Sequence, residues 1–225
     1  MGYGYIALGG LIRSKTEQII ELLEKVQTVR RPETKVHLFG VARPEALQEF
    51  KRLGVNSVDS ARFLRQAWLS AKSNYYVCNG KNEPGERLKT YTAIRVPPLT
   101  TEDGKMPTPL ARSLVEDGAD MDMLLNIERS TIRTCQAFDR GDSTAENVMA
   151  CISEYCQLIG KKNPYEEEYA RLLRDRPWQS CPCPICRTSG IDVAIFRRNN
   201  RNRRRGFHNT WCFYQYFRNA VTDRP

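Results

Sequence analysis

Three cysteines near the end of the chain have the spacing of metal ligands. Cys181, Cys183 and Cys186 lie within six residues, and the prolines between them stiffen the turn. A structural zinc site takes all four of its soft or borderline ligands from protein. His208, 22 residues after Cys186, is placed to complete a Cys3His set. Such a closed site leaves no open coordination position, so we predict a structural Zn²⁺ without metal chemistry.

Two other residues bear on this ligand set. Cys212 is an alternative fourth ligand, in which case His208 would only cap a helix. His37, the other of the two histidines, lies in the apolar run VHLFGV, where we expect a packed core residue.

Cys151 and Cys156 fall in a helical pattern and are expected to pack as small apolar side chains. In a reducing compartment, clustered thiols indicate a metal before a disulfide.

Small and acidic residues follow three apolar runs and are candidates for a second site. Gly9 and Gly10 follow the first run, Gly40 lies within the second, and Asp59 ends the third. A glycine pair lets a ligand approach the backbone closely, although a tight turn is the commoner reason for one. Asp59 is either the N-cap of the next helix or a carboxylate nucleophile or base. Spacing alone does not decide between these roles.

An arginine-rich run gives the chain a candidate surface for a polyanion. The formal net charge is +9, which favours such a partner through attraction that does not depend on sequence. Residues 197–205 read RRNNRNRRR, which is also compatible with a solvated loop or a localisation signal. Aromatic neighbours such as Phe196 and Trp211 indicate instead that the run is fixed to a folded element. The candidate phosphate contacts are Arg197, Arg198, Arg201, Arg203, Arg204 and Arg205.

The first 60 residues repeat a strand-then-helix pattern. Ser14, with Glu17 three residues later, is the expected capping box of the first helix. Gly54 is the expected stop of the second helix. Strands alternating with helices at this spacing imply parallel βα units. We expect strands at 5–8, 36–41 and 57–59, and helices reaching 29 and spanning 44–53.

The remainder of the chain is predicted to be mostly helical. We expect a helix over 61–70, short strands at 75–78 and 88–94, helices between 108 and 174, and a last helix over 208–219. The predicted organisation is a βα part (1–70), a helical insertion (71–177) and a zinc-binding subdomain (178–225).

The overall composition is that of an ordinary globular protein. Hydrophobic residues make up 40% of the chain and charged residues 27%. No apolar run approaches the roughly 18–20 residues that span a bilayer, and the N-terminus lacks a signal-peptide layout. We therefore expect a cytoplasmic protein with no membrane partner.

Several motifs, in this order, resemble the tRNA-guanine transglycosylase superfamily. YIALGGL (5–11) is similar to the glycine-glycine-leucine loop of that family, and HLFGVARP (37–44) to its next strand and loop. VDSA (58–61) resembles the strand end that carries the nucleophilic aspartate. CPCPIC followed by His208 resembles the family's zinc site. The resemblance covers residues 5–65 and 178–216, and it extends most closely to the branch that modifies DNA.

This resemblance implies a fold, a reaction and several site residues. The fold would be the C-terminal part of a (β/α)8 (TIM) barrel. Gly9, Gly10 and Leu11 would hold the base, and Asp59 would attack the sugar to form a covalent intermediate. A 7-deazaguanine such as preQ0 would then replace guanine in DNA, or, as an alternative, in tRNA as a queuine- or archaeosine-type enzyme does.

The family's earlier strands, with a second aspartate that is the presumed general base, have no counterpart here. We therefore expect a fragment, or one part of a split enzyme whose partner chain supplies the N-terminal barrel half, and no activity from this part alone. The competing hypothesis is a non-catalytic, zinc-stabilised subunit that binds nucleic acid.

Overall fold

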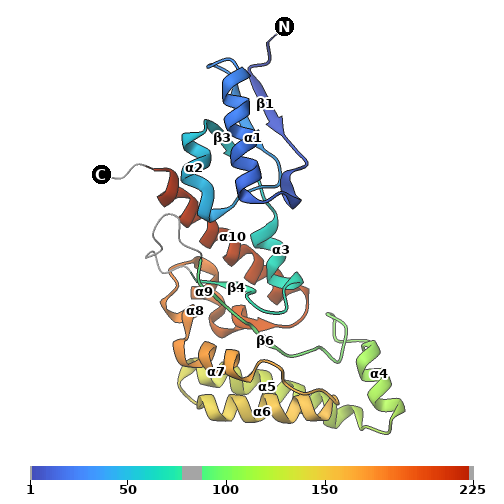
Figure 1. Ribbon diagram of the computed structural model, residues 1–225. Coiled ribbons are helices and arrows are strands. Elements are labelled where there is room, and N and C mark those ends of the chain that lie inside the picture. Colours follow the sequence, from blue (N-terminus) through green and yellow to red (C-terminus); the bar gives the residue numbers. More distant parts are fainter. Residues whose placement is uncertain (1, 78–87, 223–225) are drawn as a thin grey trace.

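The computed structural model describes residues 2–77 and 88–222. A small parallel sheet with its helices lies at one end of the molecule, and a cluster of antiparallel helices lies at the other (Figure 1). A long helix, α10 (Asn199–Val221), runs between them. The mixed α/β class predicted from the sequence is confirmed.

The three predicted strands form one parallel sheet. The strands are β1 (Tyr5–Leu8), β2 (Lys35–Leu38) and β3 (Val55–Val58), in the order β1-β2-β3. Leu8 pairs with Leu38, and Leu38 pairs with Val58. All three strands therefore end at the same edge of the sheet, where the glycine pair, Gly40 and Asp59 follow them. Over the described residues these strands do not close into a barrel.

One face of this sheet is covered by helices and forms a small core. Ile19, Leu23 and Phe50 pack there with the buried Val36 and Leu38. The first helix begins later than predicted, because the backbone N–H of Lys15, not of Ser14, donates to a side chain, Gln18 Oε1, at 2.8 Å. The elements of this part are η1 (Leu11–Arg13), α1 (Thr16–Val29), η2 (Pro44–Ala46), α2 (Leu47–Arg52) and α3 (Arg62–Leu69).

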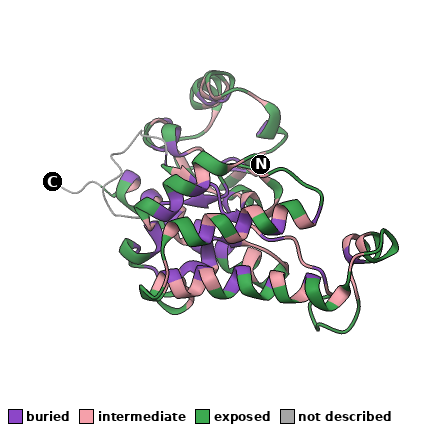
Figure 2. Cartoon of the chain, turned by 90° about the horizontal axis from the view of Figure 1, so that it is seen from below, coloured by how far each residue is buried: buried purple, intermediate pink, exposed green. Residues whose placement is uncertain are grey.

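The rest of the chain forms a larger core. In Figure 2 the buried residues gather at the centre, and the outer faces of the helices are exposed. The helices are α4 (Pro109–Glu116), α5 (Met121–Arg140), α6 (Ala145–Leu158), α7 (Glu166–Asp175), α8 (Pro177–Ser180), α9 (Pro184–Ser189) and η3 (Gly190–Ala194). Two short pairings complete it: β4 (Tyr75–Tyr76) with β5 (Thr90–Tyr91), antiparallel, and β6 (Ile94–Arg95) with β7 (Ile195–Phe196), parallel.

The last helix is longer than the sequence indicated. It begins at Asn199 rather than His208, so most of the arginine-rich run is helical. It packs closely on α3 because Gly206 has no side chain: a Cβ there would lie 2.9 Å from the Leu64 carbonyl oxygen. This contact joins the two parts of the molecule. Among the described residues, no helix has the length and apolar character needed to cross a membrane.

Candidate metal site and nucleophile

The four predicted metal ligands meet in the larger core. All four side chains are buried, and their ligand atoms lie within 4.8 Å of one another. His208 Nδ1 lies 3.3 Å from the Sγ atoms of Cys183 and Cys186 and 3.8 Å from Cys181 Sγ. A tetrahedral zinc with ordinary Zn–S and Zn–N bonds separates such atoms by about 3.6 Å. The donor set and its spacing therefore fit a structural Zn²⁺.

The surroundings of His208 fix which nitrogen faces the thiols. Its Nε2 lies 2.7 Å from the carbonyl oxygen of Tyr76 and must carry the proton to donate to it. Nδ1 is then left with its lone pair toward the cysteines, as a metal ligand requires. Tyr75 stacks on the imidazole ring at 4.5 Å. Burial alone would lower the pKa of His208, but hydrogen bonds with Cys181 and Cys183 raise it to about 9 without a metal.

The alternative ligand, Cys212, lies one turn further along α10. Its Sγ is 3.4 Å from His208 Nε2 and 3.9 Å from Nδ1, so it is nearer the side of the ring that faces away from the three thiols. His208 lies well inside α10 and does not cap it. The geometry favours His208 as the fourth ligand.

Asn209 connects the metal site to the helix that follows Asp59. Its Oδ1 accepts from the backbone N–H of Tyr76 at 3.0 Å. Its Nδ2 donates to the carbonyl oxygens of Phe63 at 3.3 Å and Asn74 at 3.0 Å. Phe63 belongs to α3, so the ligand-bearing turn of α10 holds α3 directly.

Asp59 lies at the carboxyl edge of the parallel sheet. Its Oδ1 accepts the backbone N–H of Gly40 at 2.8 Å and contacts His37 Nε2 at 3.2 Å. Its own N–H donates to the Leu38 carbonyl at 3.3 Å. It caps no helix, since α3 has no side-chain cap and begins three residues later. The N-cap alternative for Asp59 is therefore wrong.

A cavity of about 550 Å³ opens beside this carboxylate. Gly40, Asp59 and Ile12 line one side, and α3 lines the other with two exposed arginines, Arg62 and Arg65. The sequence did not single out these two arginines, because isolated arginines in a helix form no motif. Their position after a strand-end aspartate was the only available signal.

The predicted base-binding residues divide into two groups. Gly9 and Gly10 are exposed, and Gly10 has a left-handed φ of 76° that favours glycine. Leu11 is buried in the small core and anchors the loop. None of the three lines the cavity, which Ile12 of the same loop reaches.

Arg205 cannot contact phosphates as predicted, because its side chain is buried in the protein. It is fully buried and donates to the carbonyl oxygens of Ala67 at 2.6 Å, Ile195 at 3.1 Å and Val193 at 3.3 Å. Burial lowers the pKa of Arg205 to about 9, so the side chain remains charged at neutral pH. Its role is to join α3 to the start of α10.

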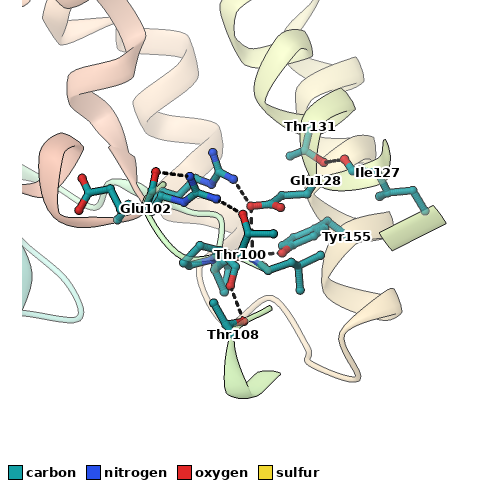
Figure 3. A network of polar contacts seen from close by, with 12 residues as sticks. Thr100, Glu102, Thr108, Ile127, Glu128, Thr131 and Tyr155 are labelled. Atoms are coloured by element: carbon teal, nitrogen blue, oxygen red, sulfur yellow. Dashed lines mark hydrogen bonds and ion pairs between the residues drawn. The ribbon is translucent and has the colours of Figure 1, made fainter. Parts of the chain in front are cut away.

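Three more arginines of the run are held by protein groups. Arg197 forms an ion pair with the buried Glu128, and Arg198 donates to Thr100 Oγ1 (Figure 3). Arg201 pairs with Asp192 at 3.2 Å. These contacts fix the run to the helical part, as the aromatic neighbours had indicated, but they occupy the guanidinium groups. Only Arg203 and Arg204 of the six are exposed.

Fold and site together define a class: an α/β protein with a strand-end carboxylate beside a cavity and a buried Cys3His centre. No protein-family model matches the chain. A curated protein of Salmonella montevideo named DNA-guanine transglycosylase is 37% identical over 227 residues, covering 100% of this chain and 51% of the relative. The chain thus spans about half the length of the curated relative it matches. It belongs to the guanine transglycosylase family, and the resemblance to the DNA branch is confirmed.

Proposed function

We propose that the chain is the nucleophile-bearing part of a transglycosylase that replaces guanine in DNA with a 7-deazaguanine such as preQ0. One observation carries the proposal. The carboxylate of Asp59 lies at the cavity with one oxygen held by the Gly40 amide and the other carboxylate oxygen available to attack. The name of the relative supports guanine as the departing base and DNA as the polymer.

In the proposed reaction, an oxygen of Asp59 bonds to the anomeric carbon of the nucleotide while the bond to guanine breaks. The incoming 7-deazaguanine then attacks the same carbon and releases the carboxylate. One proton passes to the departing base and one leaves the incoming base. We propose that a group of the second polypeptide segment described below moves these protons. The target base must leave its stack to reach the carboxylate.

The proposed nucleic-acid surface is centred on the cavity. Arg62 and Arg65 are exposed on its α3 side, within reach of the phosphates that flank a base inserted there. Arg203 and Arg204 are exposed at the start of α10, which packs against α3. Each phosphate contact on duplex DNA should contribute about −0.9 to the salt slope of binding. Gly9 and Gly10 are exposed on the same edge of the sheet and, although they do not line the cavity, are proposed to meet the base.

A second polypeptide segment is proposed to complete this site. β1 and β3 are the two edges of the three-stranded sheet in the described part of the chain. Tyr5 of β1 and Phe39, which directly follows the central strand β2, are about half exposed, at 51% and 53%. A cavity of about 430 Å³ also lies along β3, lined by Val55 and by Phe217 of α10. Strand edges and apolar surface of this kind fit the rest of a barrel, such as the part of the relative outside the match.

Zinc has a supporting role in this proposal. When bound by the Cys3His set, it supplies folding free energy and no chemistry. Through Asn209 and α3, the bound site would fix the segment that follows Asp59.

The test is an exchange assay on the chain combined with the segment of the relative outside the match. Guanine-containing DNA and tRNA are offered with a labelled 7-deazaguanine. We expect label in DNA with the wild type and with Asp142→Asn, an exposed carboxylate control, and none with Asp59→Asn. Label in tRNA alone would support the tRNA alternative. Nucleic-acid binding without incorporation would support the non-catalytic subunit, and equal incorporation by Asp59→Asn would refute the nucleophile.

A further inference from the structure

A line of polar side chains crosses the uncovered face of the sheet and ends at Asp59. Tyr5, Ser57 and His37 come from β1, β3 and β2, and their side chains point away from the small core. The Tyr5 hydroxyl contacts Ser57 Oγ, and Ser57 Oγ lies 2.7 Å from His37 Nδ1. His37 Nε2 lies 3.2 Å from Asp59 Oδ1. Neighbouring strands thus place four polar groups in contact.

The carboxylate determines the direction of these hydrogen bonds. An ionised aspartate only accepts, so His37 must carry its proton on Nε2 to donate to Asp59. Nδ1 of a neutral ring then accepts from the Ser57 hydroxyl, and Ser57 Oγ accepts from Tyr5. Every donor in the line therefore points toward Asp59, and a single tautomer of His37 satisfies all the contacts.

We propose that His37 is a positioning residue for Asp59. Together with the Gly40 amide it holds Oδ1, so that Oδ2 faces the cavity as the attacking atom. Ser57 and Tyr5 in turn hold the imidazole in the donating tautomer. This inference rests on the proposed function for the role of Asp59, while the hydrogen-bonded line itself can be tested without it.

The surroundings of His37 favour this role over that of a packed core residue. Its side chain is 20% exposed, and that of Asp59 is 57% exposed. Phe39 packs edge-on against the imidazole at 4.7 Å and limits its rotation. A ring fixed by a neighbouring aromatic group and by two polar partners is prepared to hold a carboxylate without further ordering.

The first experiment is 15N NMR of the imidazole rings in the zinc-loaded chain. The chain has only two histidines, and His208 serves as an internal reference because its Nδ1 faces the thiols. We expect His37 to be protonated on Nε2. In Ser57→Ala, the loss of the donor to Nδ1 should weaken that preference and produce a mixture of tautomers. A wild-type His37 protonated on Nδ1, or a tautomer unchanged in Ser57→Ala, would overturn the line of donors.

The second experiment measures exchange with the completed enzyme. His37→Ala should lower kcat about 10- to 100-fold with little change in KM, because the carboxylate loses its orientation but the substrate contacts remain. His37→Gln, whose amide nitrogen can replace Nε2, should recover part of that loss. Wild-type kcat in His37→Ala, or equal losses in Ala and Gln variants, would overturn the positioning role. If Asp59→Asn remains active as well, it is the proposed function that fails.

Discussion

The sheet that carries Asp59 and the core that carries the Cys3His cluster are enclosed to different degrees. The metal ligands are all buried, and every side of His208 meets protein: three thiols, the Tyr76 carbonyl and the Tyr75 ring. The Asp59 side chain is 57% exposed, and in the described part of the chain its partner His37 lies on the face of the sheet away from the small core. All four candidate metal ligands come from the described residues and are enclosed, whereas the proposed reactive carboxylate lies in open surroundings.

This difference assigns separate tasks to the two regions. The core with the Cys3His cluster is joined to α3 by hydrogen bonds from Asn209 and Arg205, and we expect it to stabilise that helix. In the proposed function, the sheet supplies the reactive group and leaves room for the base and for a second polypeptide segment. Variants in the first region should therefore change stability, and variants in the second should change exchange.

The largest effect is expected from loss of the metal. His208→Ala or Cys183→Ser should remove zinc and lower the free energy of unfolding by about 4 kcal/mol or more, as expected when a buried metal site is lost. Metal content per chain and thermal unfolding by circular dichroism measure this. Cys156→Ser, on the partly exposed side of α6, is the control and should keep its zinc. Full zinc in both ligand variants would contradict the assignment.

Truncation of Arg205 should lower the stability of the protein, whereas truncation of Arg203 should weaken DNA binding. Arg205→Ala leaves the carbonyl oxygens of Ala67 and Ile195 without their donor in a buried site, and should cost about 3 kcal/mol of stability. Arg203→Ala should change stability by less than about 0.5 kcal/mol but weaken DNA binding and its salt dependence. Urea unfolding and a salt titration of DNA binding separate the two. Equal losses of stability in Arg205→Ala and Arg203→Ala would contradict the buried, structural role of Arg205.

Gly40 should be more sensitive to substitution than Gly9. Gly40→Ala must adopt a φ near 70° and brings a Cβ to 2.9 Å from Ile12 Cδ1, which should cost about 1–2 kcal/mol. It should also lower exchange, since the amide that holds Asp59 shifts. Gly9→Ala, with nothing within 4 Å of its Cβ, is the matched control for stability. Chemical denaturation of both variants checks this. If Gly40→Ala is as stable as Gly9→Ala, the loop after β2 is not held in the conformation described.

The smallest effect concerns a buried thiol of the helical part. Burial raises the pKa of Cys135 to about 12. The folded thiol therefore keeps its proton above pH 9, where the unfolded thiol loses it, so this contribution to stability falls as pH rises from about 9 to 12. At pH 8.5 we expect iodoacetamide to modify Cys151 well before Cys135, as measured by peptide mass spectrometry. Early modification of Cys135 would show that this core opens readily.

Local patterns in the sequence were sufficient for much of this architecture. Apolar runs and glycines placed the three strands, and the Cys181–Cys186 spacing identified the metal cluster. The start of α10 was missed because residues 199–205 have no apolar periodicity, and the helix there depends on Arg205 reaching carbonyls of distant segments. The contacts of His37 could not be predicted, because only strand register brings it beside Ser57 and Asp59.

The most direct test of the proposed reaction is the identity of the residue that bonds to the sugar. The completed enzyme is incubated with guanine-containing DNA without an incoming base, denatured and digested, and the peptides are analysed by mass spectrometry. We expect a sugar adduct on Asp59, absent from Asp59→Asn. An adduct on another residue, or exchange that proceeds with no adduct on Asp59, would contradict it.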